Sequence, residues 1–161
     1  YGMDDDTLEA ALGQKLSENR LTIAVAESCT GGLISKRLTS TPGSSDYFLG
    51  SITAYSNKLK TLLLGVAEET IEKYGAVSEE VAKEMVKGIR KKVRADISIS
   101  TTGISGPGGG TELKPVGLVY IAISTPVKSM VKKYNFEFGR EIHREMTATA
   151  ALNLTRLAID Y

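Results

Sequence analysis

Apolar positions follow two different patterns along the chain. Some recur with a period of about 3.6 residues, which is typical of helices with one buried face, and others form short runs typical of buried strands. Because the two patterns alternate, the sequence predicts an α/β fold, whose last two strands form an antiparallel hairpin. The predicted helices cover residues 8–16, 33–38, 58–64, 68–74, 78–93 and 140–159, and the predicted strands cover 21–26, 47–55, 97–100, 116–124 and 130–138.

Three predicted helices carry an apolar stripe that we expect to face the core. The acidic run Asp4–Asp6 and Thr7 suit the start of the first helix, and Ser78 is expected to cap the long helix that follows it. The stripes consist of Leu8, Ala11, Leu12 and Leu16; of Val81, Met85, Ile89 and Val93; and of Met146, Ala150, Leu154 and Leu157.

Composition limits the classes of protein that fit. The chain has 161 residues, 42% of them hydrophobic, and a formal net charge of +1, which suits one globular domain. The basic run 87–94 lies on an amphipathic helix and is interpreted as a solvated face. Tryptophan is absent and aromatic residues are not interleaved with basic ones, so nucleic-acid binding is not expected. No apolar run approaches the ~20 residues of a membrane span, so a membrane role is not expected either.

Cysteine and histidine each occur once. A single cysteine, Cys29, excludes an intrachain disulfide, and a single histidine, His143, leaves a zinc site short of ligands. No metal is therefore expected. His143 lies inside the last predicted helix and is interpreted as a surface residue. The sequence shows no signal peptide, which favours a reducing cytoplasm.

The stretch after the first strand carries candidate chemistry. Ser28 is followed by Cys29, Thr30 and two glycines, and then by a helix whose N-terminal amides suit an oxyanion. Ser28 is interpreted either as a nucleophile at the strand exit or as the cap of this helix. Cys29 is a rival nucleophile, or a small buried residue without a chemical role.

A second glycine-rich segment, residues 103–110, also follows a strand. Its spacing fits neither a dinucleotide-binding fingerprint nor a phosphate-binding loop of the Gly-Lys-Ser/Thr type. Its backbone N–H groups suit an anion, and two such loops at strand ends imply one shared crevice. The alternative interpretation is a long flexible turn.

Candidate bases and cations occur at other element ends. Lys58 and Lys60 follow Tyr55 where a strand passes into a helix, and a lysine desolvated in a crevice can serve as the base of a serine nucleophile. Both lysines could equally be exposed. Arg140 follows Gly139 at a predicted helix start, and is either a ligand for phosphate or carboxylate or a solvated arginine.

Taken together, these segments resemble the C-terminal domain of the competence/damage-inducible protein CinA, a domain that also occurs alone as the nicotinamide-nucleotide amidase PncC. The resemblance implies one three-layer α/β/α domain with a mixed sheet over residues 1–161, of which 1–8 resemble the end of a connector. The stretches that carry it are residues 26–32, 42–45, 55–57 with Lys60, 75–78, 103–110, 114–117 and 138–140 with Arg144.

The resemblance also implies an activity, the hydrolysis of nicotinamide mononucleotide to nicotinic acid mononucleotide and ammonia, with no metal or other cofactor. Ser28 would be the nucleophile, Lys60 the base and Tyr55 its helper. Two departures from the family pattern are Ser105, where alanine is common, and the lack of an aspartate between Gly139 and Arg140, for which Arg144 is a fallback. The implied substrate-binding residues are Thr30, Gly31, Gly32, Thr102, Gly103, Ser105, Gly106 and Arg140.

The resemblance further implies partners: nicotinamide mononucleotide as the small-molecule substrate, and a pyrophosphatase-like N-terminal domain in a longer protein. A homodimer is expected only because two-fold dimers are the commonest symmetric assemblies. The alternative function is a non-catalytic nucleotide-sensing or competence-related interaction module. The joint presence of Ser28, Tyr55 and Lys60 favours the enzyme.

Overall fold

The computed structural model describes residues 6–159, and the predicted elements are all present with shifted ends. The acidic residues Asp4 and Asp5 and the connector residues 1–5 lie outside the described part. The helices are α1 (Leu8–Glu18), α2 (Leu33–Thr39), the 3-10 turn η1 (Ser44–Asp46), α3 (Asn57–Leu64), α4 (Glu68–Tyr74), α5 (Glu79–Val93) and α6 (Arg140–Ala158). The strands are β1 (Ile23–Glu27), β2 (Phe48–Thr53), β3 (Ile97–Gly103), β4 (Leu118–Ser124) and β5 (Ser129–Asn135).

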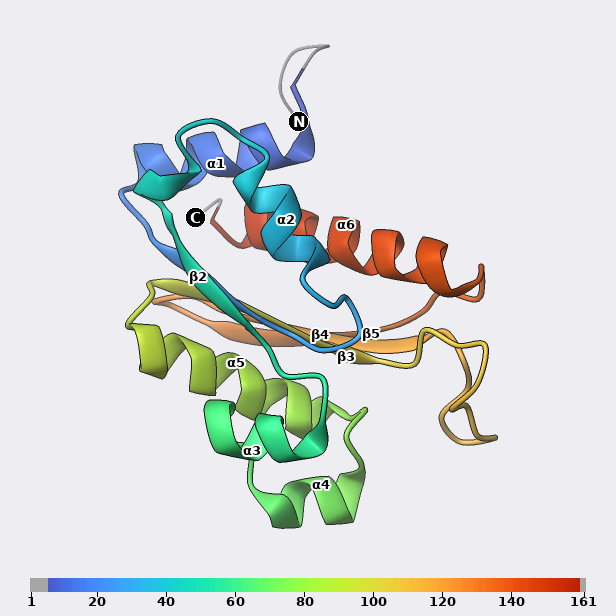
Figure 1. The fold of residues 1–161 in the computed structure, drawn as a ribbon. Coiled ribbons are helices and arrows are strands. Elements are labelled where there is room, and N and C mark those ends of the chain that lie inside the picture. The colour runs from blue at the N-terminus through green and yellow to red at the C-terminus, as the bar shows by residue number, and fades with distance from the viewer. Residues whose placement is uncertain (1–5, 160–161) are drawn as a thin grey trace.

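The strands form one mixed sheet in the order β2-β1-β3-β4-β5. β1 is parallel to both β2 and β3, whereas β3, β4 and β5 are successively antiparallel, as predicted for the final hairpin. Helices α1, α2 and α6 cover one face, and α3, α4 and α5 lie on the other (Figure 1). The expected three-layer α/β/α fold with a mixed sheet is confirmed. None of the helices within residues 6–159 is both long and apolar enough to cross a membrane.

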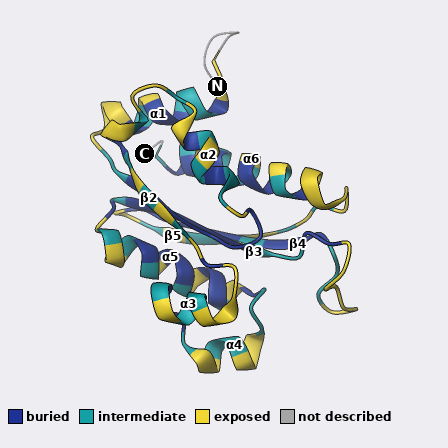
Figure 2. Ribbon diagram, in the orientation of Figure 1, coloured by how far each residue is buried: buried dark blue, intermediate teal, exposed yellow. Residues whose placement is uncertain are grey.

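The interior strand β1, between β2 and β3, is buried along its whole length because helices cover both of its faces (Figure 2). Ile23 and Val25 belong to the core under α1, α2 and α6, whereas Ala24 and Ala26 belong to the core against α3 and α5. The strand alternation thus assigns its small residues to the α5 side, where they leave room for that helix.

The predicted helix stripes meet two different outcomes. Leu8, Leu12 and Leu16 of α1 are buried as expected, and so are Val81, Met85 and Ile89 of α5. The remaining members of these two stripes, Ala11 and Val93, are partly buried. Thr7 and Ser78 cap these two helices, each accepting a hydrogen bond from a backbone N–H of the first turn.

The stripe predicted for α6 is only partly correct. Ala150 and Leu154 are partly buried and pack against the core, whereas Leu157 is 47% exposed and Met146 is only partly buried. Apart from Leu152, the fully buried side chains of α6 are small or polar, which lets the helix lie close to the sheet. The buried residues are His143, Thr147, Ala148, Ala151, Leu152, Thr155 and Ala158.

The topology places a crevice beside the carboxyl end of β1. The chain leaves β1 through α2 to reach β2 on one side, and returns through α5 to β3 on the other side. Such a switch point is where open α/β sheets bind ligands. Ser28 directly follows β1, so the fold places it at this point.

Candidate active site

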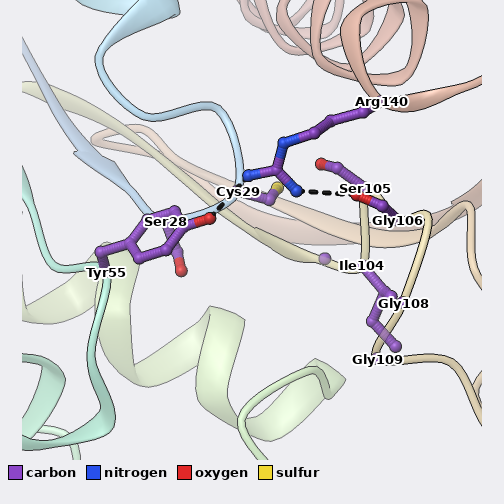
Figure 3. Close-up of a pocket in the computed structure, with 10 residues that line it drawn as sticks. Ser28, Cys29, Tyr55, Ile104, Ser105, Gly106, Gly108, Gly109 and Arg140 are labelled. Atoms are coloured by element: carbon purple, nitrogen blue, oxygen red, sulfur yellow. Dashed lines mark hydrogen bonds between the residues drawn. The ribbon is translucent and has the colours of Figure 1, made fainter.

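A cavity of about 260 Å³ opens at the carboxyl edge of the parallel strands. Four separate segments form it: the turns after β1, β2 and β3, and the start of α6 (Figure 3). The shared crevice expected from the two glycine-rich segments is therefore present. The lining residues are Ser28, Cys29, Tyr55, Gly103, Ile104, Ser105, Gly106, Gly108, Gly109 and Arg140.

Ser28 lines the cavity and does not cap the following helix. The N-cap of α2 is Gly32, which makes no side-chain cap. The carboxylate of Glu27 takes that role by accepting hydrogen bonds from the N–H groups of Ile34 at 2.9 Å and Ser35 at 3.2 Å. Within residues 6–159 the Ser28 hydroxyl has no hydrogen-bond partner, so it is available to a ligand. The capping interpretation of Ser28 is wrong.

The turn 30–32, which the resemblance implies as substrate-binding, does not line the cavity, and its hydrogen bonds go to neighbouring protein groups. The N–H of Gly31 donates to the carbonyl of Ser28 at 3.0 Å, and Thr30 Oγ1 shares a hydrogen bond with Thr101 Oγ1. Arg144 Nη2 donates to the carbonyl of Thr30 at 2.9 Å. Gly31 has a φ of +58°, which favours glycine, and a Cβ there would meet Arg144 Nη2 at 2.8 Å, so a larger residue would strain the turn and displace the arginine. Arg144 therefore supports the turn and lies outside the cavity lining.

Lys60 is buried, whereas Lys58 is exposed, so the two candidate bases have separate environments. Lys60 Nζ donates to the backbone carbonyl of Tyr55 at 3.4 Å. Burial lowers the pKa of Lys60, because an ammonium loses hydration there. The interpretation as an exposed lysine is wrong for Lys60. Among the described residues its hydrogen bond goes to Tyr55 and not to Ser28, and Lys60 is not part of the cavity lining.

Cys29 lies in the cavity wall but is a poor nucleophile. Its side chain is 6% exposed, and burial raises the pKa of the thiol to about 12. A thiol must ionise to attack a carbonyl, and at neutral pH this one remains protonated. Ser28 is therefore the better candidate of the two neighbours.

Arg140 joins two walls of the cavity. Its Nη1 donates to the carbonyl of Gly106 at 2.8 Å, and its Nη2 donates to the Tyr55 hydroxyl at 2.9 Å (Figure 3). Arg140 is exposed, as the interpretation as a solvated arginine expects, but its guanidinium is held by these two hydrogen bonds at the cavity lining. A guanidinium at the cavity lining suits a ligand that carries a phosphate or a carboxylate.

The glycine loop is fixed where it lines the cavity. Gly106 has a φ of +83°, and a Cβ there would meet Val116 at 2.5 Å. Gly103, Ser105 and Gly106, which the resemblance implies as binding residues, all line the cavity. Thr102 does not, because its hydroxyl donates to the carbonyl of Ala76 at 2.7 Å. Thr102 therefore connects β3 to the segment before α5.

His143 is buried, so its interpretation as a surface residue is wrong. Its Nδ1 lies 2.9 Å from Ser105 Oγ, and its Nε2 lies 3.1 Å from the carbonyl oxygen of Gly117. Burial lowers the pKa of His143, and the nearby Arg140 acts in the same direction. The sequence contained a signal for this residue, since His143, Thr147 and Ala151 follow one another at helical spacing on the buried face of α6.

The fold and the cavity define a class of protein: a three-layer α/β/α domain with a serine-bearing ligand pocket at the carboxyl edge of its parallel strands. The chain belongs to the CinA C-terminal domain family, whose model matches residues 5–159.

Relatives and solved structures agree with this assignment. A CinA-like protein of Desulfotalea psychrophila is 54% identical over 156 residues, which are 97% of this chain and 38% of the relative. A CinA-like protein of Gloeothece citriformis is 49% identical, with the same two shares. The chain thus spans well under half the length of these relatives.

Two solved structures match the whole domain. The competence/damage inducible protein CihA of Agrobacterium tumefaciens has a TM-score of 0.91 at 33% identity, with both chains fully covered. A CinA superfamily protein of Escherichia coli has a TM-score of 0.88 at 30% identity, and the match covers 99% of this chain and 93% of the other.

Proposed function

We propose that the domain is an amidohydrolase that deamidates nicotinamide mononucleotide. Three features support this proposal: membership of the CinA C-terminal domain family, a serine hydroxyl available in the cavity, and a guanidinium in the lining of the same cavity. The substrate combines a carboxamide, which a serine can attack, with a phosphate, which an arginine can bind. The availability of Ser28, with Glu27 as the helix cap, is the observation that carries the proposal.

In the first half of the reaction, Ser28 Oγ forms a bond to the carboxamide carbon and loses its proton to neutral Lys60. The tetrahedral intermediate then collapses, its C–N bond breaks, and the nitrogen leaves as ammonia with that proton. The lowered pKa of Lys60 suits the role of base, because more of the amine is unprotonated at neutral pH than for an exposed lysine. The hydrogen bond of its Nζ to Tyr55 would be exchanged for one to Ser28 when substrate binds.

In the second half, water attacks the acyl-enzyme ester and the bond to Ser28 Oγ breaks. The products are the free serine and a carboxylate, so the sum is amide plus water giving acid plus ammonia. Arg140 and the amides of Gly108 and Gly109 would hold the phosphate, because these groups line the cavity and are hydrogen-bond donors. Tyr55 would act in two ways, through its carbonyl on Lys60 and through its hydroxyl on Arg140.

The test is ammonia release from nicotinamide mononucleotide, with no metal added, by the wild type and by Ser28→Ala. Release by the wild type and its loss in Ser28→Ala would support the proposal. Cys29→Ala is the matched control at the neighbouring position and should keep activity. Activity in Ser28→Ala together with loss in Cys29→Ala would assign the nucleophile to the thiol instead.

A second function, a nucleotide sensor without turnover, is favoured by one observation. Within the described residues, the Nζ of Lys60 is bonded to Tyr55 and not to Ser28. A sensor would bind nicotinamide mononucleotide saturably and release no ammonia. Calorimetry beside the ammonia assay separates the two functions.

A further inference from the structure

Ser105 and His143 form a buried polar pair that has no part in the mechanism above. Ser105 lines the cavity and is 6% exposed, whereas His143 lies behind it and is fully buried. The hydrogen bond between Ser105 Oγ and His143 Nδ1 measures 2.9 Å. On its other side, the imidazole meets the carbonyl oxygen of Gly117 at 3.1 Å.

The carbonyl of Gly117 determines where the imidazole proton lies. A carbonyl oxygen only accepts hydrogen bonds, so Nε2 of His143 must carry the proton. In the neutral ring Nδ1 is then an acceptor, and the Ser105 hydroxyl must donate to it. Rotation of this hydroxyl toward the cavity would leave Nδ1 buried without a donor, which is costly.

Burial lowers the pKa of His143 and favours the neutral ring, although the hydrogen bond to the Gly117 carbonyl acts in the opposite direction. The groups that face it are Ser105 from the glycine loop, the Gly117 carbonyl before β4, the edge of Phe136 after β5, and Arg140 on α6. Arg140 is the charged group among them, and a second positive charge beside it is disfavoured. The hydroxyl of Ser105 is therefore committed to the histidine at neutral pH.

We propose that Ser105, held by His143, is an acceptor-only subsite that binds a neutral N–H or O–H donor of the ligand and disfavours an anionic oxygen. With its proton committed to Nδ1, the serine oxygen offers only lone pairs to the cavity. His143 acts as a positioning residue, because it reaches the ligand only through Ser105.

The identity of the donor rests on the proposed function. In nicotinamide mononucleotide the neutral donors are the carboxamide NH₂ and the ribose hydroxyls, whereas the phosphate offers anionic oxygens. The phosphate is thus directed to Arg140 and away from Ser105. If the carboxamide is the donor, the same subsite disfavours the product, whose carboxylate has no proton to give.

The experiment measures calorimetric affinities in a Ser28→Ala background, which prevents turnover. The probes are nicotinamide mononucleotide and nicotinic acid mononucleotide, which differ only in NH₂ against O⁻. We expect Ser105→Ala to lower the preference for the amide by about tenfold if the carboxamide is the donor, since one hydrogen bond is lost. If a ribose hydroxyl is the donor, both probes weaken by about the same factor. Unchanged affinities for both would overturn the proposal.

Two histidine variants test the positioning role. His143→Leu removes the acceptor and releases the Ser105 hydroxyl, so the amide probe should weaken by several-fold. His143→Asn supplies an amide oxygen as a replacement acceptor, so binding should recover toward the parent value. A folded His143→Leu protein that binds both probes as the parent does would overturn the role. If His143→Leu does not fold, Ser105→Ala still decides the question.

The two proposals fail in different ways. Binding that responds to Ser105→Ala, in a wild-type protein that releases no ammonia, would contradict the amidase and leave the subsite intact. If the wild type releases ammonia and Ser105→Ala leaves both calorimetric affinities unchanged, the subsite proposal is contradicted and the amidase proposal is not.

Discussion

The carboxylate of Glu27 accepts a hydrogen bond from the backbone N–H of Ile34 at 2.9 Å. The last residue of β1 thus neutralises the positive end of α2, the place where an external anion would otherwise bind. The oxyanion site expected at this helix start is consequently occupied by the protein's own side chain. The ligand is left with the cavity on the other side of the turn.

We expect Glu27→Gln to lower the free energy of unfolding by about 1 kcal/mol and to reduce the proposed release of ammonia. The amide keeps one acceptor but places an NH₂ group where a second acceptor stood, and the turn that carries Ser28 shifts. Urea denaturation and the ammonia assay measure the two effects. The control is Glu72→Gln, at an exposed position on α4, which should change neither. Equal stability of both variants would contradict the capping role.

Lys60→Met should abolish ammonia release and raise the free energy of unfolding by about 1 kcal/mol at pH 7. A buried amine with a lowered pKa binds fewer protons folded than unfolded, so wild-type stability rises with pH up to the ordinary value of 10.5. The advantage of methionine should therefore shrink as the pH approaches 10.5. Lys58→Met, at the exposed lysine two residues earlier, serves as the control and should leave activity largely intact. A Lys60→Met protein that is less stable than the wild type would argue against a charge penalty at this site.

Cys29 should resist alkylation in the folded protein. Its thiol is buried and its pKa is raised to about 12, so iodoacetamide at pH 8 meets almost no thiolate. Mass spectrometry before and after unfolding in urea should show modification only in the unfolded chain. Rapid labelling of the native protein would show that the turn opens readily or that the thiol is ionised.

Arg140 and Tyr55 should show energetic coupling in substrate binding, because Nη2 of the arginine bonds to the phenol hydroxyl at 2.9 Å. We expect Arg140→Lys to raise KM by about tenfold, since a lysine cannot bond to Tyr55 and Gly106 together. Tyr55→Phe in the Arg140→Lys background should then cost less than it does alone. Additive effects of the two substitutions on KM would show that the bond has no part in binding.

The free energy of unfolding should fall as the pH drops below 6.5, and protonation of His143 in the unfolded chain should contribute to this fall. Folding lowers the pKa of His143 below its ordinary value of 6.5, so on acidification the unfolded chain takes up the proton first. The contribution is fully present above pH 6.5 and is lost between 6.5 and the lower folded pKa. Since the sequence has one histidine, His143→Asn should flatten the curve in this window. An unchanged slope in this variant would contradict the prediction.

The layered fold and most of the cavity could be predicted because they depend on local patterns. Alternating apolar runs located the strands, and glycines after β1 and β3 marked both loops of the site. Ser28 was recognisable as a candidate, but its alternative role as a cap could be rejected only once Glu27 was seen to hold α2.

What failed depended on contacts between distant segments. His143 and Ser105 are 38 residues apart in the sequence, so no local sequence pattern could predict the hydrogen bond between them. The buried face of α6 was misassigned because close packing on the sheet favours alanine and threonine over the larger Met146 and Leu157. Burial of Lys60 but not Lys58 likewise depends on which side of α3 meets the core. The homodimer, the N-terminal domain and the cytoplasmic location stay predictions.

The alternation of side chains along β1 gives the neighbours Glu27 and Ser28 different roles, one as the cap of α2 and one in the cavity lining. Val25 faces the α2 side and Ala26 faces the α5 side, and Glu27 turns back to α2. Ser28 directly follows Glu27. The two side chains point to different sides because neighbouring positions along a strand alternate between its two faces. Deletion of a single residue within β1 would exchange the two faces, directing the carboxylate toward the ligand and the hydroxyl toward the helix. The number of residues in β1 therefore determines which side of the sheet Glu27 and Ser28 face, so the length of the strand matters to the site as much as the serine does.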